Sequence, residues 1–248
     1  MSTHENSSKK LQQTSRFAGS LLVAVLLLGT VVMIVSLLAT QTEISQAISS
    51  LFALDNVHLW WYISRAAGLM SYLLLWLSTI WGFAVGSKIF DSFLERMFTF
   101  DFHEYLSLLG LGFVGLHAIV LVLDRVEPLS LAEILLPFIS SYRPFWTGIG
   151  IIAFYLSVLV TVTFYLRSRI SMKTFRSIHY LSIVAYAGAL FHGLYAGTDS
   201  SLPWAQIMYW GTFLSTIFFS VYWLVILWLR RRGVNRQAQV QRERGYQP

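Results

Sequence analysis

Residues 100–123 form an apolar stretch that is long enough to cross a lipid bilayer and nevertheless contains two histidines. His103 and His117 are 14 residues apart. At about 100° and 1.5 Å per residue, a helix returns to within roughly 40° of the same face after this step and advances ~21 Å. Gly110 lies midway between them. The spacing predicts a helix that offers two ring nitrogens, with bare backbone between them, to flat and bulky ligands. This glycine and those at 112 and 115 fit a helix-packing surface equally well.

A second stretch, residues 176–193, repeats the arrangement with His179 and His192 thirteen residues apart and small residues between them. Histidine inside a membrane span is costly and usually faces the protein interior. A single such histidine is more often a satisfied polar contact, but the repeat in two spans favours haem ligation. A thirteen-residue step leaves His192 roughly 140° from the face of His179 on an ideal helix. This helix is therefore expected to be bent or overwound between them, or else the two haems contact different sides of it.

The composition is that of an integral membrane protein. Of the 248 residues 56% are hydrophobic and only 12% are charged, whereas soluble domains carry about 25% charged residues. The absence of cysteine excludes disulfides, iron–sulfur clusters and cysteine-based zinc sites. The sequence pI of 9.7 does not indicate nucleic-acid binding, because the basic residues lie in loops that flank the spans.

The apolar runs predict an all-α bundle of six transmembrane helices. The spans are expected at 17–39, 60–85, 100–123, 144–166, 175–196 and 204–229. The first is expected to be retained, because no A-x-A cleavage site follows it. Residues 1–16 form a disordered basic N-terminus, residues 17–230 the transmembrane domain and residues 231–248 a basic tail. Short helices are expected at the membrane surface within 42–56 and 124–142.

The basic residues predict the orientation of the bundle. All 18 lysines and arginines except Arg65, Arg125 and Arg143 fall on one side of the predicted membrane. By the positive-inside rule both termini then lie in the cytoplasm, and the chain is a multi-pass protein of the plasma or inner membrane. His103 and His179 lie toward the cytoplasm, and His117 and His192 toward the outside. The pairing by depth predicts two bis-histidine haem sites stacked across the membrane, about 20 Å apart.

A haem held by two imidazoles has no open coordination position, which suits electron transfer. Each imidazole is expected to donate its second N–H to a carbonyl or carboxylate, and Asp101 and Glu104 lie near the inner pair in sequence. Arg65, at the outer end of the second span, suits the propionates of the outer haem; the alternative is that it snorkels to the interface. His4 and His58 are weaker candidates for a site.

Three segments resemble the ferric reductase-like transmembrane domain family: F-H-E-Y…L-H-A in the third span, I-H-Y…F-H-G in the fifth and S-R-A-A-G at 64–68. The family includes ferric reductases, NADPH oxidases and the haem-binding subunit of the periplasmic methionine sulfoxide reductase system. The resemblance covers nearly the whole chain. It implies two b-type haems, with iron ligated by His103, His117, His179 and His192, and Arg65 near the outer haem. The 14- and 13-residue spacings resemble those of the oxidase branch.

These observations predict a b-type cytochrome that carries electrons from a cytoplasmic donor to an outer acceptor, namely ferric iron, oxygen or a periplasmic partner protein. Large members of the family continue into FAD and NADPH domains, but no G-x-G-x-x-G motif follows a predicted strand here. The donor is therefore expected to be a separate flavoprotein, a loosely bound flavin or a membrane quinol, and the basic inner loops suit an acidic partner. The alternatives are a quinol-oxidising cytochrome b subunit and a non-redox transport protein with a histidine relay.

Overall fold

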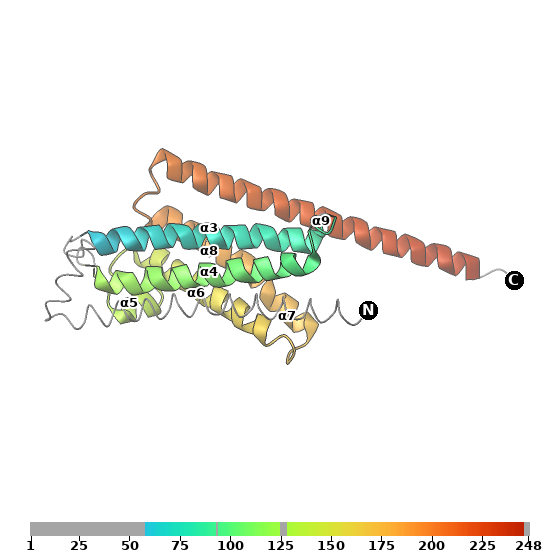
Figure 1. Ribbon diagram of the computed structural model, residues 1–248, viewed down its shortest axis with the longest axis horizontal. Coiled ribbons are helices and arrows are strands. Elements are labelled where there is room, and N and C mark those ends of the chain that lie inside the picture. Colours follow the sequence, from blue (N-terminus) through green and yellow to red (C-terminus); the bar gives the residue numbers. More distant parts are fainter. Residues whose placement is uncertain (1–57, 93, 125–127, 246–248) are drawn as a thin grey trace.

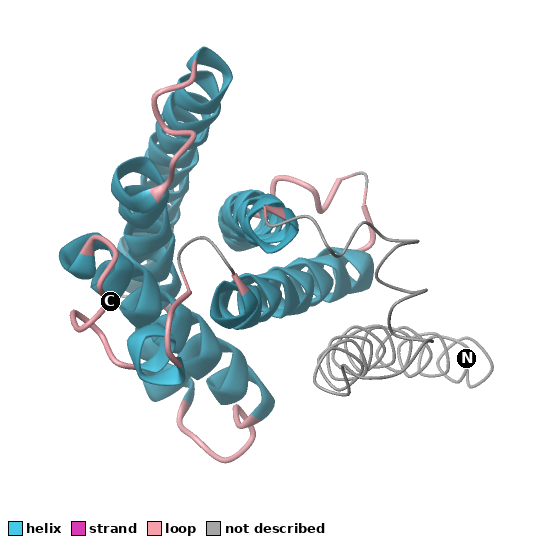
Figure 2. Cartoon of the chain, turned by 90° about the vertical axis from the view of Figure 1, so that its left-hand side faces the viewer, coloured by secondary structure: helices cyan, strands magenta, loops and turns pink. Residues whose placement is uncertain are grey.

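The computed structural model describes residues 58–92, 94–124 and 128–245, with side chains as far as residue 232. It is 81% helix, and no strand occurs in the described residues (Figures 1 and 2). The span predicted at 17–39 and the surface helix predicted within 42–56 lie outside these residues. The number of spans and the side on which the termini lie therefore stay predictions.

Four long helices correspond to the second, third, fourth and sixth predicted spans. They are α3 (Leu59–Ser87), α4 (Arg96–Leu123), α6 (Pro144–Tyr165) and α9 (Pro203–Gly245). The first three, and the part of α9 up to Arg232, are long and apolar enough to cross a membrane. Their length and composition are accordingly those of a membrane protein. Beyond Arg232 the predicted basic tail continues the helix as far as Gly245.

The fifth predicted span is two helices rather than one. They are α7 (Met172–His179) and α8 (Leu181–Ala196), and the interruption falls at Tyr180. The N–H of Ile183 donates to the carbonyl of Tyr180 at 3.1 Å, a three-residue step tighter than that of an α-helix. The chain is therefore interrupted between the two histidines, directly after His179. This accounts for a spacing of thirteen that an ideal helix does not accommodate.

Local capping sets where the shorter helices begin. Helix α5 (Leu131–Leu135), in the connection where a short surface helix is predicted, starts with a capping box in which Ser130 and Glu133 exchange side-chain and backbone hydrogen bonds. At α7 the side chain of Ser171 accepts from the N–H of Thr174. Proline in the first turn of α6, where it costs no hydrogen bond, begins that helix at Pro144.

Four of the helices are packed as two antiparallel pairs. The most extensive contacts are between α3 and α4 and between α6 and α8, whereas α4 and α6 touch much less; α9 packs mainly on α3 (Figure 1). Gly110 belongs to the α3–α4 contact, because Ser71 donates to its carbonyl at 3.3 Å and an added Cβ would meet Leu74 at 3.4 Å. This favours the helix-packing interpretation of Gly110.

Candidate functional site

The four histidines predicted as ligands lie in two close pairs, with the two rings of each pair steeply tilted to one another. The ring centres of His103 and His179 are 6.0 Å apart, and those of His117 and His192 are 6.2 Å apart. The interplanar angles, 70° and 72°, are nearly the same. Helix α4 contributes one ring to each pair, and α7 and α8 contribute the others. These are the two pairs that the sequence predicts from matched depth.

The separation within each pair fits one metal ion between two imidazoles. With metal–nitrogen bonds of about 2.0 Å and about 1.1 Å from each ring centre to its nitrogen, two coaxial rings would lie about 6.2 Å apart. No group of three or more His, Asp or Glu side chains that could hold a metal ion occurs in the described part of the chain. Each pair would therefore give a metal two protein ligands, which is the number that an iron already held by four porphyrin nitrogens needs.

The hydrogen bonds of His117 and His192 fix which ring nitrogen is free. Nδ1 of His117 lies 2.9 Å from the carbonyl oxygen of Ser64, and Nδ1 of His192 lies 2.9 Å from that of Trp146. A carbonyl only accepts, so in each neutral ring Nδ1 carries the proton and donates it. The lone pair is then on Nε2, which is the nitrogen available to a metal.

A chain of hydroxyl groups gives the same result for His103. The hydroxyl of Ser107 donates its single proton to the carbonyl of His103 at 2.8 Å. In the 2.8 Å contact between Ser78 and Ser107 it is therefore Ser78 that donates. Having used its proton, the Ser78 oxygen accepts from Nδ1 of His103 at 3.3 Å. Nε2 of His103 is again left with its lone pair.

His179 differs from the other three. Its Nδ1 is buried and has no hydrogen-bond partner among the residues that the structure describes. Its ring lies 5.4 Å from that of Phe175, one turn earlier on α7. The histidine is thus placed in the pair by α7 alone, without an oxygen that orients it.

Three glycines make room for the other three rings. A Cβ added to Gly68 would lie 3.0 Å from Nδ1 of His117, and one added to Gly82 would lie 3.3 Å from Cε1 of His103. At Gly150 the added atom would lie 2.6 Å from Nδ1 of His192, closer than real Cβ contacts allow. The rings therefore pack directly on the backbone of the neighbouring helix.

The serines and glycines of α3 that contact the histidines are not among the residues predicted above, although the sequence contains a signal for them. Ser64 and Gly68 recur as Ser78 and Gly82, so that S-x-x-x-G appears twice at an interval of 14 residues. His103 and His117 have the same interval on α4. Because α3 and α4 are antiparallel, Ser64 meets His117 and Ser78 meets His103. The equal interval in two adjacent predicted spans is the signal that could have identified these partners.

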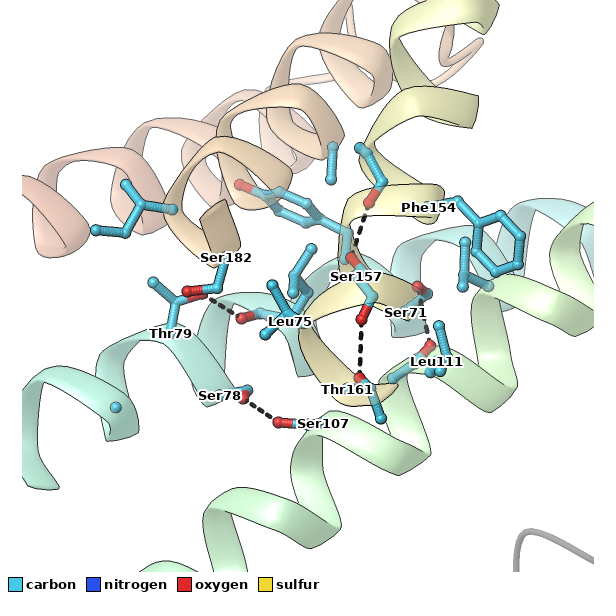
Figure 3. Close-up of a pocket in the computed structure, with 18 of the residues that line it drawn as sticks. Ser71, Leu75, Ser78, Thr79, Ser107, Leu111, Phe154, Ser157, Thr161 and Ser182 are labelled. Atoms are coloured by element: carbon cyan, nitrogen blue, oxygen red, sulfur yellow. Dashed lines mark hydrogen bonds between the residues drawn. The ribbon is translucent and has the colours of Figure 1, made fainter. Parts of the chain in front are cut away.

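A single elongated cavity of about 1270 Å³ connects the two pairs, and all four histidines line it. Pockets for one small ligand usually measure roughly 300–1,000 Å³, so this cavity has room for more than one. Figure 3 shows part of its wall, where α3, α4, α6 and α8 contribute hydroxyl groups alongside apolar side chains. Ser71, Thr79 and Ser157 each donate to a backbone carbonyl, which leaves their oxygens as acceptors.

Arg65 lies at the end of the cavity nearest His117 and is held by Asp199, which follows α8. Its Nε donates to Asp199 Oδ2 at 2.8 Å, and a second donor contacts Oδ1 of the same carboxylate. The guanidinium also lies 4.0 Å from the ring centre of Trp61. All three side chains line the cavity. A role for Arg65 with haem propionates stays a prediction, and such a role would place the propionates beside this ion pair.

The other end of the cavity, nearest His103 and His179, carries most of the charge. Five basic side chains line it there: Lys88, Arg96, Arg167, Arg176 and Arg231. We call this the basic end. Asp101 and Glu104 also line it, and the hydroxyl of Tyr165 donates to Glu104 at 2.8 Å.

Comparisons with known protein families, with characterised proteins and with solved structures found no match to this chain.

Proposed function

We propose that this protein is a di-haem b-type membrane cytochrome that carries electrons across the membrane between a donor at the basic end and an acceptor at the opposite end. One haem would lie between His103 and His179 and the other between His117 and His192. When bound, each haem supplies a six-coordinate iron that exchanges one electron without binding substrate.

The observation that carries this proposal is the combination of ring separation and ring tautomer. Two pairs of imidazoles stand at the distance that one iron requires. Three of the four rings use Nδ1 in hydrogen bonds and keep Nε2 as the ligating nitrogen. A set of satisfied polar contacts would not need two pairs of nearly equal geometry along one cavity. A proton relay would instead favour hydrogen bonds from ring to ring.

The basic end indicates where the donor docks. The positive-inside rule places this end in the cytoplasm, and its cations would favour a donor with an acidic surface. The donor is then a separate flavoprotein, a loosely bound flavin or a quinol. The acceptor at the other end is ferric iron, oxygen or a periplasmic protein. In this role the chain is the electron-transfer component of an oxidoreductase.

The test is the visible spectrum of the detergent-purified protein, oxidised and dithionite-reduced, with the haem content measured as pyridine haemochrome. About two low-spin b haems per chain are expected. His103→Ala and His117→Ala should each lose one haem and keep the other, and His58→Ala, outside both pairs, should keep both. Absence of haem from protein made in haem-replete cells would refute the proposal and favour a transport function.

A further inference from the structure

We infer that His179 is the displaceable ligand of the four, and that the His103–His179 pair is therefore a binding site for a small neutral ligand with a free lone pair, of which carbon monoxide is the probe. This inference rests on the proposed function, because it concerns how the chain's own residues hold a haem. It adds a binding activity that electron transfer does not require.

The first argument is the missing hydrogen bond. Carbonyl or hydroxyl oxygens hold Nδ1 of His103, His117 and His192, while Nδ1 of His179 is buried without a partner in the described structure. A second hydrogen bond fixes the orientation of a ligating imidazole and raises its basicity. His179 lacks both effects, so its bond to a metal should be the weakest of the four. A displaced ring that reaches water would also recover the hydrogen bond that burial denies it.

The second argument is packing around the ring. The rings of His103, His117 and His192 lie against Gly82, Gly68 and Gly150 respectively. No described glycine has His179 among the nearest neighbours of its Cβ position. A ring that lies against helix backbone cannot move without moving that helix, whereas the His179 ring lies beside the side chain of Phe175.

The third argument is the helix that carries the ring. Helix α7 has no buried residue and packs on α6 and α8 at the basic end of the bundle (Figure 1). Its continuity with α8 is interrupted at Tyr180, the residue after His179. Segments with few buried contacts open at low free-energy cost. Motion of α7 about Tyr180 would withdraw His179 and leave His192, on α8, in place.

The proposed binding step exchanges one ligand for another. If haem is bound between His103 and His179, Nε2 of His179 would give up its bond to the iron, the lone pair of the incoming molecule would take its place, and no electron or proton would be transferred. The ligand must be neutral and small, because it occupies the space that one imidazole edge vacates. His103 would keep its place, since Ser78 and Gly82 hold its ring.

The experiment is a carbon monoxide titration of the full-length, dithionite-reduced protein, followed by difference spectroscopy. One of the two haems should bind carbon monoxide and the other should stay low-spin. His192→Ala removes a ligand of the other pair. In this variant the haem at His103 and His179 should still bind carbon monoxide, with the affinity that it has in the wild-type protein. Phe175→Gln should place an amide oxygen one turn from His179, where it can accept from Nδ1, and should weaken carbon monoxide binding by about tenfold or more. Phe175→Leu is the matched control without an acceptor, and it should retain the wild-type affinity.

The outcomes separate this inference from the proposed function. Protein without haem would refute the proposed function itself. Two low-spin haems that ignore saturating carbon monoxide would leave that function standing and overturn the inference, as would equal binding at both haems. Equal effects of Phe175→Gln and Phe175→Leu would overturn the role of the missing hydrogen bond.

Discussion

The imidazole of His192 lies directly on the backbone of Gly150, so that a methyl group at Gly150 would come within 2.6 Å of Nδ1. The same nitrogen donates to the carbonyl of Trp146, one turn earlier on α6. Helix α6 thus orients the ring with the carbonyl oxygen of Trp146, and Gly150 leaves the space that the ring occupies. Both contacts are made while the ring centre lies 6.2 Å from that of His117.

The first prediction follows from this contact. Gly150→Ala should displace His192 and lower the haem content from about two per chain toward one, because overpacking of this kind costs about 1–3 kcal/mol. The pyridine haemochrome assay measures the change. Gly112→Ala is the matched control, since its added Cβ would meet nothing within 4 Å. Equal haem content in both variants would contradict the assignment of His192.

The second prediction concerns the hydroxyl chain at His103. Ser78→Ala removes the hydroxyl that accepts from Nδ1 of His103 and leaves Ser107 without its donor. Loss of such an orienting partner typically costs about 10–100-fold in metal affinity, so the variant should lose haem from this pair first during dilution or competition with apomyoglobin. Ser157→Ala serves as the control, because that hydroxyl lines the same cavity and bonds only within α6. Equal rates of haem loss in the two variants would show that the Ser78 hydroxyl does not help to hold haem.

The third prediction separates two roles of Arg65. Its guanidinium pairs with Asp199, and the two side chains are 28% and 14% exposed, so solvent screens the pair only in part. Asp199→Asn should lower the free energy of unfolding by about 1–3 kcal/mol, since a charged donor group loses its partner. Denaturant unfolding in detergent measures this effect. If Arg65 also holds haem propionates, Arg65→Gln should lower haem content while Asp199→Asn does not; equal haem content in both would limit Arg65 to the ion pair.

The fourth prediction is a pH dependence outside the membrane spans. N–H groups of Ser130 and Ser141 donate to the carboxylate of Glu133 at 2.9 and 2.7 Å, and these bonds lower its pKa from 4.5 to about 2. Because the folded pKa is depressed, the carboxylate stabilises the α5 loop above pH 4.5, and this contribution is lost as the pH falls through about 2. Carbon-13 NMR of the carboxyl group, assigned with Glu133→Gln, should give the low midpoint. A midpoint near 4.5 would show that the capping box does not persist in solution.

Much of the fold could be predicted from the sequence, because long apolar runs require helices in a membrane. The interruption at Tyr180 could not be located, since the residues next to it include neither proline nor glycine. An odd spacing indicated that the helix was not ideal. Only the structure shows that one helix ends at His179 and the next begins at Leu181.

The candidate site was predictable in part for a similar reason. Histidines are rare in spans, so their pairing followed from their number and depth. Their partners were harder to identify, because the oxygens that hold His117 and His192 belong to the backbone of Ser64 and Trp146. A backbone carbonyl carries no sequence signal of its own, and only the repeated S-x-x-x-G of α3 pointed to Ser64. Asp199 could not be assigned to Arg65 from the sequence, because it lies 134 residues away, in the loop that follows α8.

The matched intervals on α3 and α4 have a consequence for how the protein can change. One register between two antiparallel helices sets both sites, so a slide of α3 along α4 would carry Ser64 and Ser78 away from their histidines by the same step. The two sites would then fail together. A single residue inserted between His103 and His117 would instead rotate one ring by about 100° relative to the other and spoil one site alone. The distance between the two sites is therefore set by the number of residues in α3 and α4. We expect these two helices to tolerate substitutions far more readily than insertions or deletions.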